Sequence, residues 1–502
     1  MRLTLFEVNT DEDLKKFLRQ ISVSTMLEWI HKYSIAAYTK TDMQDLFKHI
    51  IARDEKTGKI IENDIIIQPW QFADLAYYSI LYSNDFRGIK ELNDEMFLSI
   101  LGIMNNFMET KTIPLIENLN TPLDSSLYLY GFGGEQFKYQ TKFMSYHKLI
   151  RLLYLIFTVS KKINSNINPS VIIKEEIGIE WEQLIKVLFS IYLNSFIDQH
   201  VNATLKNISS NDNKYEIFEK VIEYYSIDFD EIRTNKLGRQ IFYTKPFVRT
   251  QKNELLSISV FLNSFIVEQA PFWIIRNYYQ KQPKKLRQSF TDEFGKWFEF
   301  YFNEVCDYFK IQHEKIPENK KESADWKLVI GNHIFLIEQK SSVAALSIKQ
   351  QLPNISDYKE LMRRTVFKAI KQLYETENDL KVNNPIKIIL CYDDYIEPNI
   401  LPHFFEDNEC TIKNDGRFFI ANIIEMEMFL ELATTDSALF EKVIGDMLDR
   451  NIKSNEKGLS LFKIMRDNGF SNNSYWISPI FDEYKNLLKD IKNNHMCFKH
   501  II

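Results

Sequence analysis

The sequence predicts an α/β domain with a mixed β-sheet flanked by helices, preceded by a large, mostly α-helical region. Up to about residue 283, apolar residues recur at spacings of three and four, as in Trp181–Asp198, and glycine is sparse. Beyond residue 289, short apolar runs alternate with helical patterns. This alternation is typical of a sheet covered by helices, so the two regions are expected to differ in architecture.

The boundary between the regions is expected in the polar segment 277–289, which contains Pro283 and four basic residues, Lys281, Lys284, Lys285 and Arg287. The chain is then divided into three parts. Residues 1–283 form a mostly helical region for recognition or interaction, residues 289–430 form the α/β domain, and residues 431–502 form a helical C-terminal extension.

The composition and charge of the chain limit the classes of protein to which it can belong. The chain has 502 residues and a net charge of −6, so it lacks a global cationic field for nucleic acid or anionic membrane. Its four cysteines show no CxxC spacing, and no apolar run reaches the roughly 18 residues of a membrane span. No signal peptide pattern is visible at the N-terminus. We therefore expect a soluble, cytoplasmic protein that does not act at a membrane.

The α/β domain is expected to begin with a helix at Thr291, whose hydroxyl can cap the first turn. The remaining elements are expected in a fixed order: strands 325–330 and 333–340, a helix over 356–374, a strand over 386–392, and a strand over 418–424 that leads into a helix.

The first two strands are separated by Gly331-Asn332, a sequence typical of a two-residue hairpin turn. In that register Asp325 lies opposite Glu338, and period-two alternation places Lys340 on the same face as Glu338. Like charges opposite each other destabilise a sheet, and a divalent cation between them would remove the conflict. Two carboxylates about 5 Å apart suit Mg²⁺, which would activate a water for attack on a phosphodiester, with Lys340 beside it.

The helix that follows is predicted to present Arg364, Lys368 and Lys371 on its polar side, with Gln372 at the border of the apolar stripe. Such a cationic face can follow a phosphate backbone. Taken alone, it is more often a solvated helix face.

The residues Gly295–Glu299, Ala324-Asp325, Glu338-Gln339-Lys340 and Lys368–Leu373 together resemble the PD-(D/E)xK nuclease superfamily. The resemblance covers about residues 289–425 and departs at Ala324, where the motif has proline. It implies Mg²⁺, with Mn²⁺ as a substitute. The implied roles are metal ligation by Asp325, Glu338 and the backbone carbonyl of Gln339, catalysis by Lys340, water orientation or auxiliary ligation by Glu299, and support of the lysine or the metal-bound water by Gln372.

The resemblance implies a metal-dependent endonuclease or exonuclease, with DNA favoured over RNA. A long helical region before a nuclease core is similar to the layout of bacterial restriction and phage-defence effectors, and it implies a homo-oligomer or a partner subunit such as an ATPase. Two alternatives stay open. One is a nucleic-acid- or partner-binding protein that keeps a nuclease-like core without cutting. The other is a solvent-exposed Glu/Lys pair at a strand end.

Overall fold

The structure is a computed structural model, and every structural statement below concerns the residues that it describes. These are residues 3–39, 47–53, 57–58, 60–67, 69–86, 88–117, 119, 124–125, 146–207, 212–235, 238–317, 323–343, 355–393, 396, 398–406, 410–453, 459–470, 484 and 487.

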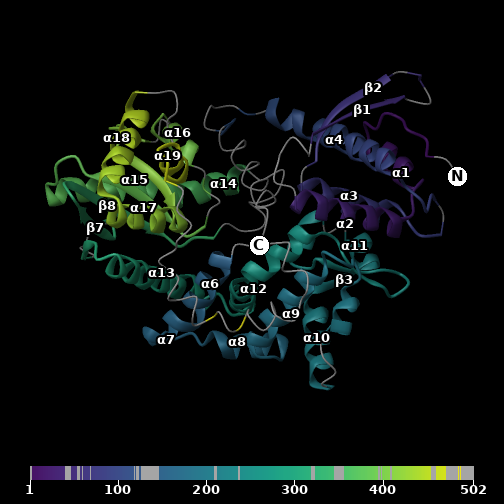
Figure 1. Ribbon diagram of the computed structural model, residues 1–502, viewed down its shortest axis with the longest axis horizontal. Coiled ribbons are helices and arrows are strands. Elements are labelled where there is room, and N and C mark those ends of the chain that lie inside the picture. Colours follow the sequence, from purple (N-terminus) through teal and green to yellow (C-terminus); the bar gives the residue numbers. More distant parts are fainter. Residues whose placement is uncertain are drawn as a thin grey trace.

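The region before residue 283 is mostly helical, as predicted (Figure 1). Its α-helices are α1 (Asp11–Leu18), α2 (Val23–Thr39), α3 (Pro69–Tyr82), α4 (Asp94–Glu117), α6 (Tyr146–Leu153), α7 (Ser160–Lys162), α8 (Pro169–Ile177), α9 (Trp181–Asn194), α10 (Asp212–Tyr225), α11 (Phe229–Asn235) and α12 (Val260–Lys281). Shorter helical turns are η2 (Tyr154–Val159), η3 (Val201–Asn207) and η4 (Arg239–Tyr243).

Two small sheets in this region were not predicted. A hairpin pairs β1 (Phe47–Arg53) with β2 (Ile60–Ile66). A three-stranded sheet has the order β3-β4-β5 and consists of β3 (Ser226–Asp228), β4 (Phe247–Arg249) and β5 (Leu255–Ser257). The strands of this three-stranded sheet are only three residues long, too short for a period-two pattern to stand out.

The second region contains a mixed five-stranded sheet, in the order β10-β9-β8-β7-β6. Its strands are β6 (Gln312–Lys315), β7 (Trp326–Ile330), β8 (His333–Lys340), β9 (Ile386–Cys391) and β10 (Phe418–Asn422). The first three strands are antiparallel, whereas β8, β9 and β10 run parallel. Edge strand β6 was not predicted, because its sequence, QHEK, is wholly polar.

The helices of this region are α13 (Ser289–Tyr308), α14 (Ile355–Met362), α15 (Lys368–Leu380), α16 (Leu401–Phe405) and α17 (Ile423–Thr435). A π-helical turn, η5 (Arg363–Phe367), joins α14 to α15, and a short turn, η6 (Pro398–Ile400), precedes α16. Helix α13 begins two residues before the predicted start. The Thr291 hydroxyl donates a hydrogen bond to the carbonyl oxygen of Gln288 and does not cap the helix.

The sheet separates two apolar layers. Side chains such as Phe335 and Ile337 of β8 belong to the large core that also contains α13 and α17. Leu336, between them, faces a second cluster with Val366 and Ile370, on the η5–α15 side. Glu338 and Lys340 follow Leu336 at period two, so they lie on the α15 side at the carboxyl end of β8.

The predicted boundary near residue 283 is a turn between α12 and α13, but the hydrophobic core is continuous across it. The ring of Phe272 packs against those of Phe290 and Phe294, with centroids 5.2 and 5.0 Å apart. Farther along, the fully buried Arg151 of α6 forms a bidentate ion pair with Glu427 of α17, at 2.8 and 2.5 Å. The two regions therefore share one interior.

The C-terminal extension is helical where the structure describes it. Helix α17 continues past the predicted boundary at residue 430 and is followed by α18 (Ser437–Lys453) and α19 (Leu461–Asp467). Of the residues beyond 470, the structure describes Tyr484 and Leu487. Among the described helices, none combines the length and apolar character needed to cross a membrane.

Candidate metal centre at the carboxyl end of β8

The hairpin between β7 and β8 has the predicted register. Ile330 pairs with His333, Leu328 with Phe335 and Trp326 with Ile337. Gly331 adopts a φ of 57°, a conformation that glycine reaches without steric cost. Asp325 directly precedes β7, where the regular pairing with β8 ends at Trp326 and Ile337. Its carboxyl group still lies close enough to Glu338 to raise the pKa of that residue.

Asp325 is held by the backbone of β8. Its N–H donates to the carbonyl oxygen of Ile337 at 3.0 Å, and its Oδ2 accepts the N–H of Gln339 at 2.6 Å. In an extended strand the N–H and C=O of one residue point to the same side, so the Gln339 carbonyl also faces Asp325. The side-chain amide of Gln339 points elsewhere: its Oε1 accepts the indole N–H of Trp326 at 2.6 Å.

The ammonium of Lys340 lies between two groups on the same face. It donates to Glu338 Oε1 at 2.6 Å and to Gln372 Oε1 at 3.0 Å. Gln372 in turn donates its amide to the carbonyl oxygen of Ser323 at 3.1 Å. Because each partner of Lys340 is fixed by the sheet or by α15, the ammonium has one defined position.

The second oxygen of Glu338, Oε2, is buried, and none of the described residues offers it a hydrogen-bond partner. Buried polar atoms are nearly always paired, so an orphaned carboxylate oxygen needs an explanation, and an absent ion is one of the usual ones. Burial and the neighbouring Asp325 raise the pKa of Glu338 to about 8, although Lys340 and Lys368 favour its charged form. Burial therefore favours the neutral form of this carboxyl group despite the nearby lysines, and a bound cation would favour its charged form.

Asp325 has the same electrostatic character. Burial raises the pKa of this carboxyl, and Glu299 of α13 adds to the rise, while the Gln339 N–H and Lys340 lower it. Glu299 itself is ion-paired to Lys315 of β6. It is close enough to raise the pKa of Asp325 through space, but its ion pair is with Lys315. The auxiliary role predicted for Glu299 stays a prediction.

The oxygen atoms at this site supply some, but not all, of the ligands that a divalent cation such as Mg²⁺ requires. Within the described part of the chain, no group of three or more His, Cys, Asp or Glu side chains is placed to hold one metal ion. The site offers two carboxyl groups and one main-chain carbonyl. Mg²⁺ commonly takes one or two carboxylates and keeps several waters, so such a set suits Mg²⁺ better than a cation that demands a full protein cage.

Thr376 is a supporting residue that sequence reasoning missed. Its hydroxyl oxygen accepts the N–H of Ala324 at 2.7 Å, and so it fixes the backbone immediately before Asp325 to α15. Thr376 lies one helical turn after Gln372, which contacts Ser323 on the same segment. This spacing of four was the available signal, because it places both side chains on one face of the helix.

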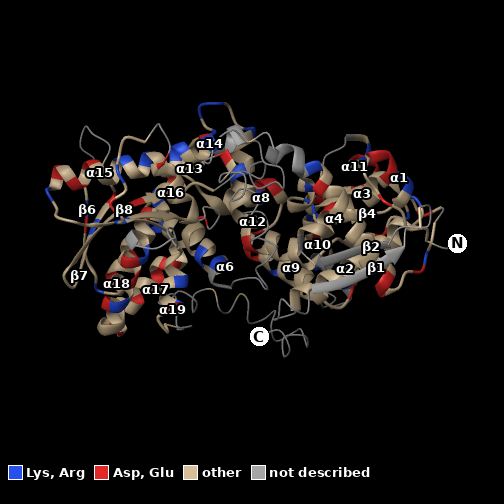
Figure 2. Ribbon diagram, turned by 90° about the horizontal axis from the view of Figure 1, so that it is seen from above, with Lys and Arg blue, Asp and Glu red and all other residues tan. Residues whose placement is uncertain are grey.

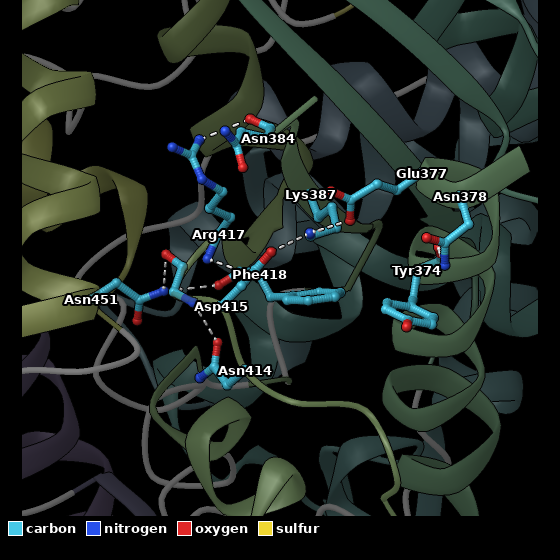
Figure 3. Close-up of polar contacts among 11 residues, drawn as sticks. Tyr374, Glu377, Asn378, Asn384, Lys387, Asn414, Asp415, Arg417, Phe418 and Asn451 are labelled. Atoms are coloured by element: carbon cyan, nitrogen blue, oxygen red, sulfur yellow. Dashed lines mark hydrogen bonds and ion pairs between the residues drawn. The ribbon is translucent and has the colours of Figure 1, made fainter. Parts of the chain in front are cut away.

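The far end of α15 is fixed by a buried lysine of β9 (Figure 3). The Lys387 side chain is fully buried, and its ammonium contacts Glu377 of α15 and Asp415 at 2.6 Å each. The ammonium also lies 4.5 Å from the ring centroid of Phe418. These contacts hold the helix that carries Gln372 against the sheet.

The predicted basic residues lie near the site but are not free of acidic neighbours. Arg364, Lys368 and Lys371 are all exposed. Arg364 pairs with Glu360 at 3.0 Å, and Lys371 approaches Glu375 at 3.9 Å. Figure 2 shows basic and acidic residues interspersed along the helices, including α15. Any contact with nucleic acid would therefore be local.

No family model matches this chain, and neither a curated protein nor a solved structure matches it.

Proposed function

We propose that the protein is a metal-dependent nuclease whose active centre contains Asp325, Glu338 and Lys340. The observation that carries the proposal is the orphaned Oε2 of Glu338, which is buried beside a second carboxyl group and an oriented ammonium. A cation at this position would give that oxygen a partner and relieve the repulsion between the two acids.

Each residue has a distinct task in phosphodiester hydrolysis. Asp325, Glu338 and the Gln339 carbonyl would hold the divalent ion. When bound, the ion supplies positive charge that activates a water and offsets charge on the phosphate. Lys340, oriented by Gln372, stabilises the negative charge that develops on a phosphate oxygen.

Nucleic acid is the proposed substrate, with DNA favoured on the basis of the resemblance. Arg364, Lys368 and Lys371 are exposed on the helix that also carries Gln372, so they can contact the phosphates flanking the bond to be cut. Changing Arg364 and Lys371 to Gln should weaken binding about equally for all sequences and reduce the salt dependence of the binding constant.

A cleavage assay tests the proposal. Purified protein is incubated with supercoiled and linear DNA, single-stranded DNA and RNA, in Mg²⁺, Mn²⁺ or EDTA. We expect metal-dependent cleavage that is lost in Asp325→Asn and Lys340→Met. Lys327→Met is the matched control, because Lys327 lies on β7 on the same sheet face but pairs with Glu314. Cleavage that survives both site substitutions would refute the assignment.

A second candidate is a protein that binds nucleic acid without cutting it. The direct contact of Lys340 with Glu338 favours this candidate, because that ion pair offsets part of the acidic charge without a metal. Isothermal titration calorimetry with Mg²⁺ and Mn²⁺ separates the two. Retained DNA binding with no metal binding at Asp325 and Glu338 would select the second candidate.

A further inference from the structure

The helical region contains a cavity of about 730 Å³, within the size range of small-molecule sites. Its walls come from α8, α10, the segment after η4 and one face of α12. Large aromatic residues, Tyr224, Tyr243, Phe265 and Trp273, line it together with Lys245. The aromatic residues Tyr224, Phe265 and Trp273 are only partly buried. They can therefore offer ring faces to a ligand.

Lys245 supplies a cation that no acid neutralises directly. Its ammonium donates to the carbonyl oxygens of Tyr224, at 2.9 Å, and Ser226, at 3.2 Å. Burial lowers the pKa of Lys245, and Glu231 offsets this only in part. The described residues place no carboxylate within ion-pair distance of this ammonium. A half-buried cation with neutral partners is a favourable position for an anionic group.

Two further lysines of the cavity are already paired, which singles out Lys245. Lys281 forms an ion pair with Glu176 at 2.5 Å, and Lys220 forms one with Glu216 at 2.7 Å. The cavity therefore combines aromatic surfaces with the cation of Lys245, and the exposed carboxylate of Glu223 also lines it. This combination suits a ligand that has a flat ring at one end and a single negative group at the other.

We propose that this cavity binds a nucleotide, with the base against Trp273 and Tyr224 and the phosphate at Lys245. A base can stack on these aromatic side chains, and a phosphate at Lys245 would add a charged hydrogen bond. Asn277, which also lines the cavity on α12, offers an amide that can bond to the edge of a base.

The cavity is connected to the proposed nuclease centre through α12. The guanidinium of Arg276 lies 5.1 Å from the ring centroid of Trp273. Its Nη1 donates to the carbonyl oxygen of Val343 at 3.2 Å, and Val343 follows Lys340 by three residues. A ligand that moves Trp273 therefore moves a group bonded to the end of the catalytic strand. This regulatory consequence rests on the proposed function, whereas the binding site does not.

Binding is tested by calorimetry on the full chain with AMP, GMP, CMP and UMP, and with adenosine and inorganic phosphate as partial ligands. We expect at least one nucleotide to bind more tightly than either partial ligand. Lys245→Met should weaken nucleotide binding by about tenfold or more and leave adenosine binding unchanged, since it removes only the phosphate contact. Lys245→Arg keeps the charge and should restore much of the affinity.

Variants of Trp273 and Lys252 serve as controls for the binding experiment. Trp273→Leu should weaken nucleotide and adenosine alike, and Trp273→Phe replaces it if the leucine variant fails to fold. Lys252→Met, an exposed lysine outside the cavity, should change nothing. The proposal is overturned if no nucleotide binds below about 1 mM, or if Lys245→Met binds nucleotide as the unchanged protein does.

The effect of nucleotide binding on DNA cleavage is measured in a separate experiment. A nucleotide that binds should change the rate of DNA cleavage, and Arg276→Met should abolish that change while binding persists. Nucleotide binding without any cleavage would refute the proposed function and leave the cavity assignment standing. Cleavage without nucleotide binding would refute the cavity assignment and leave the proposed function standing.

Discussion

Two lysines are buried on the same face of the five-stranded sheet, and their surroundings differ in charge. Lys387 of β9 is fully buried and contacts two carboxylates, Glu377 and Asp415, at 2.6 Å each. Lys340 of β8 contacts one carboxylate, Glu338, at 2.6 Å, and otherwise the neutral amide of Gln372. Both ammonium groups have hydrogen-bond partners. Among the described residues of the two clusters, only the one around Lys340 has a buried carboxylate oxygen without a partner, Oε2 of Glu338.

The difference separates a structural cluster from the one that we propose to be functional. Around Lys387 the carboxylates are 20% and 41% exposed, so water completes their solvation and nothing further is needed. Around Lys340 the Glu338 side chain is 4% exposed and its Oε2 has no partner. A buried carboxyl group with a raised pKa, next to a second carboxyl group and an ammonium, is typical of active sites, because a cation that binds there favours its charged form.

The largest expected effect is the loss of cleavage in Lys340→Met. Removal of one oriented group that stabilises transition-state charge typically lowers kcat by about 10²–10³. The melting temperature should change little, because Glu338 can take up a proton when its cation is removed. Single-turnover cleavage and thermal unfolding, measured on the same preparation, check both parts. A variant that cleaves normally would place Lys340 with the structural lysine.

Lys387→Met should give the reverse result, a loss of stability of about 3 kcal/mol, at the lower end for broken buried ion pairs because both acids reach solvent. Cleavage per folded molecule should stay within a few-fold of the unchanged protein. Urea denaturation measures the stability. If Lys387→Met instead abolished cleavage in a fully folded protein, the contrast between the two lysines would fail.

Glu338 should make the metal-free protein less stable as the pH rises. Its folded pKa of about 8 exceeds its ordinary value of 4.5, so the folded state binds the extra proton between these values. The stabilisation is complete below about pH 4.5 and is lost as the pH passes 8; we expect a loss on the order of 2 kcal/mol. Denaturation between pH 5 and 9 measures it.

Two further measurements test whether Glu338 causes this pH dependence. Glu338→Gln should flatten the dependence, because the amide does not titrate. Mg²⁺ should restore stability at pH 8–9, where Glu338 is charged and binds the ion. A metal-free protein whose stability is the same at pH 6 and pH 9 would contradict the raised pKa.

Thr376→Val should have the smallest effect, about 1 kcal/mol of stability, because it leaves the buried N–H of Ala324 without an acceptor. Since Ala324 precedes Asp325, cleavage should fall by a few-fold as well. Thr434→Val is a matched control: the Thr434 hydroxyl bonds only within its own helix, to the carbonyl oxygens of Leu430 and Glu431. A larger loss of cleavage in the control than in Thr376→Val would refute the positioning role.

The hairpin and its register were predictable because their signals are local. The Gly331-Asn332 turn and the alternation of apolar residues fix which side chains of β7 and β8 face each other. The same register predicted the approach of Asp325 to Glu338, although the regular pairing ends one residue earlier, at Trp326. The support of Lys340 by Gln372 was expected only from the resemblance to the nuclease superfamily, and the structure places the two side chains in contact.

The remaining contacts depend on segments distant in the sequence. Lys387 stands in an otherwise apolar strand, and nothing near it indicates that its partners are Glu377 and Asp415. The pairing of Glu299 with Lys315 was missed because β6 carries no apolar pattern. The three-stranded sheet before residue 283 was missed because tertiary pairing, and not intrinsic preference, decides such short strands. The hairpin of β1 and β2, whose strands are seven residues long, was also missed.

The buried ion pair between Arg151 and Glu427 sets the point in synthesis at which the interior of the protein can close. Its members are 276 positions apart, so the ribosome releases Arg151 long before its counter-charge exists. A buried guanidinium without a partner is strongly unfavourable, and the core around it is completed only after residue 427 has emerged. A polypeptide interrupted earlier would contain Asp325, Glu338 and Lys340 but lack the closed interior behind their sheet. We therefore expect the proposed cutting activity only from chains that extend beyond residue 427.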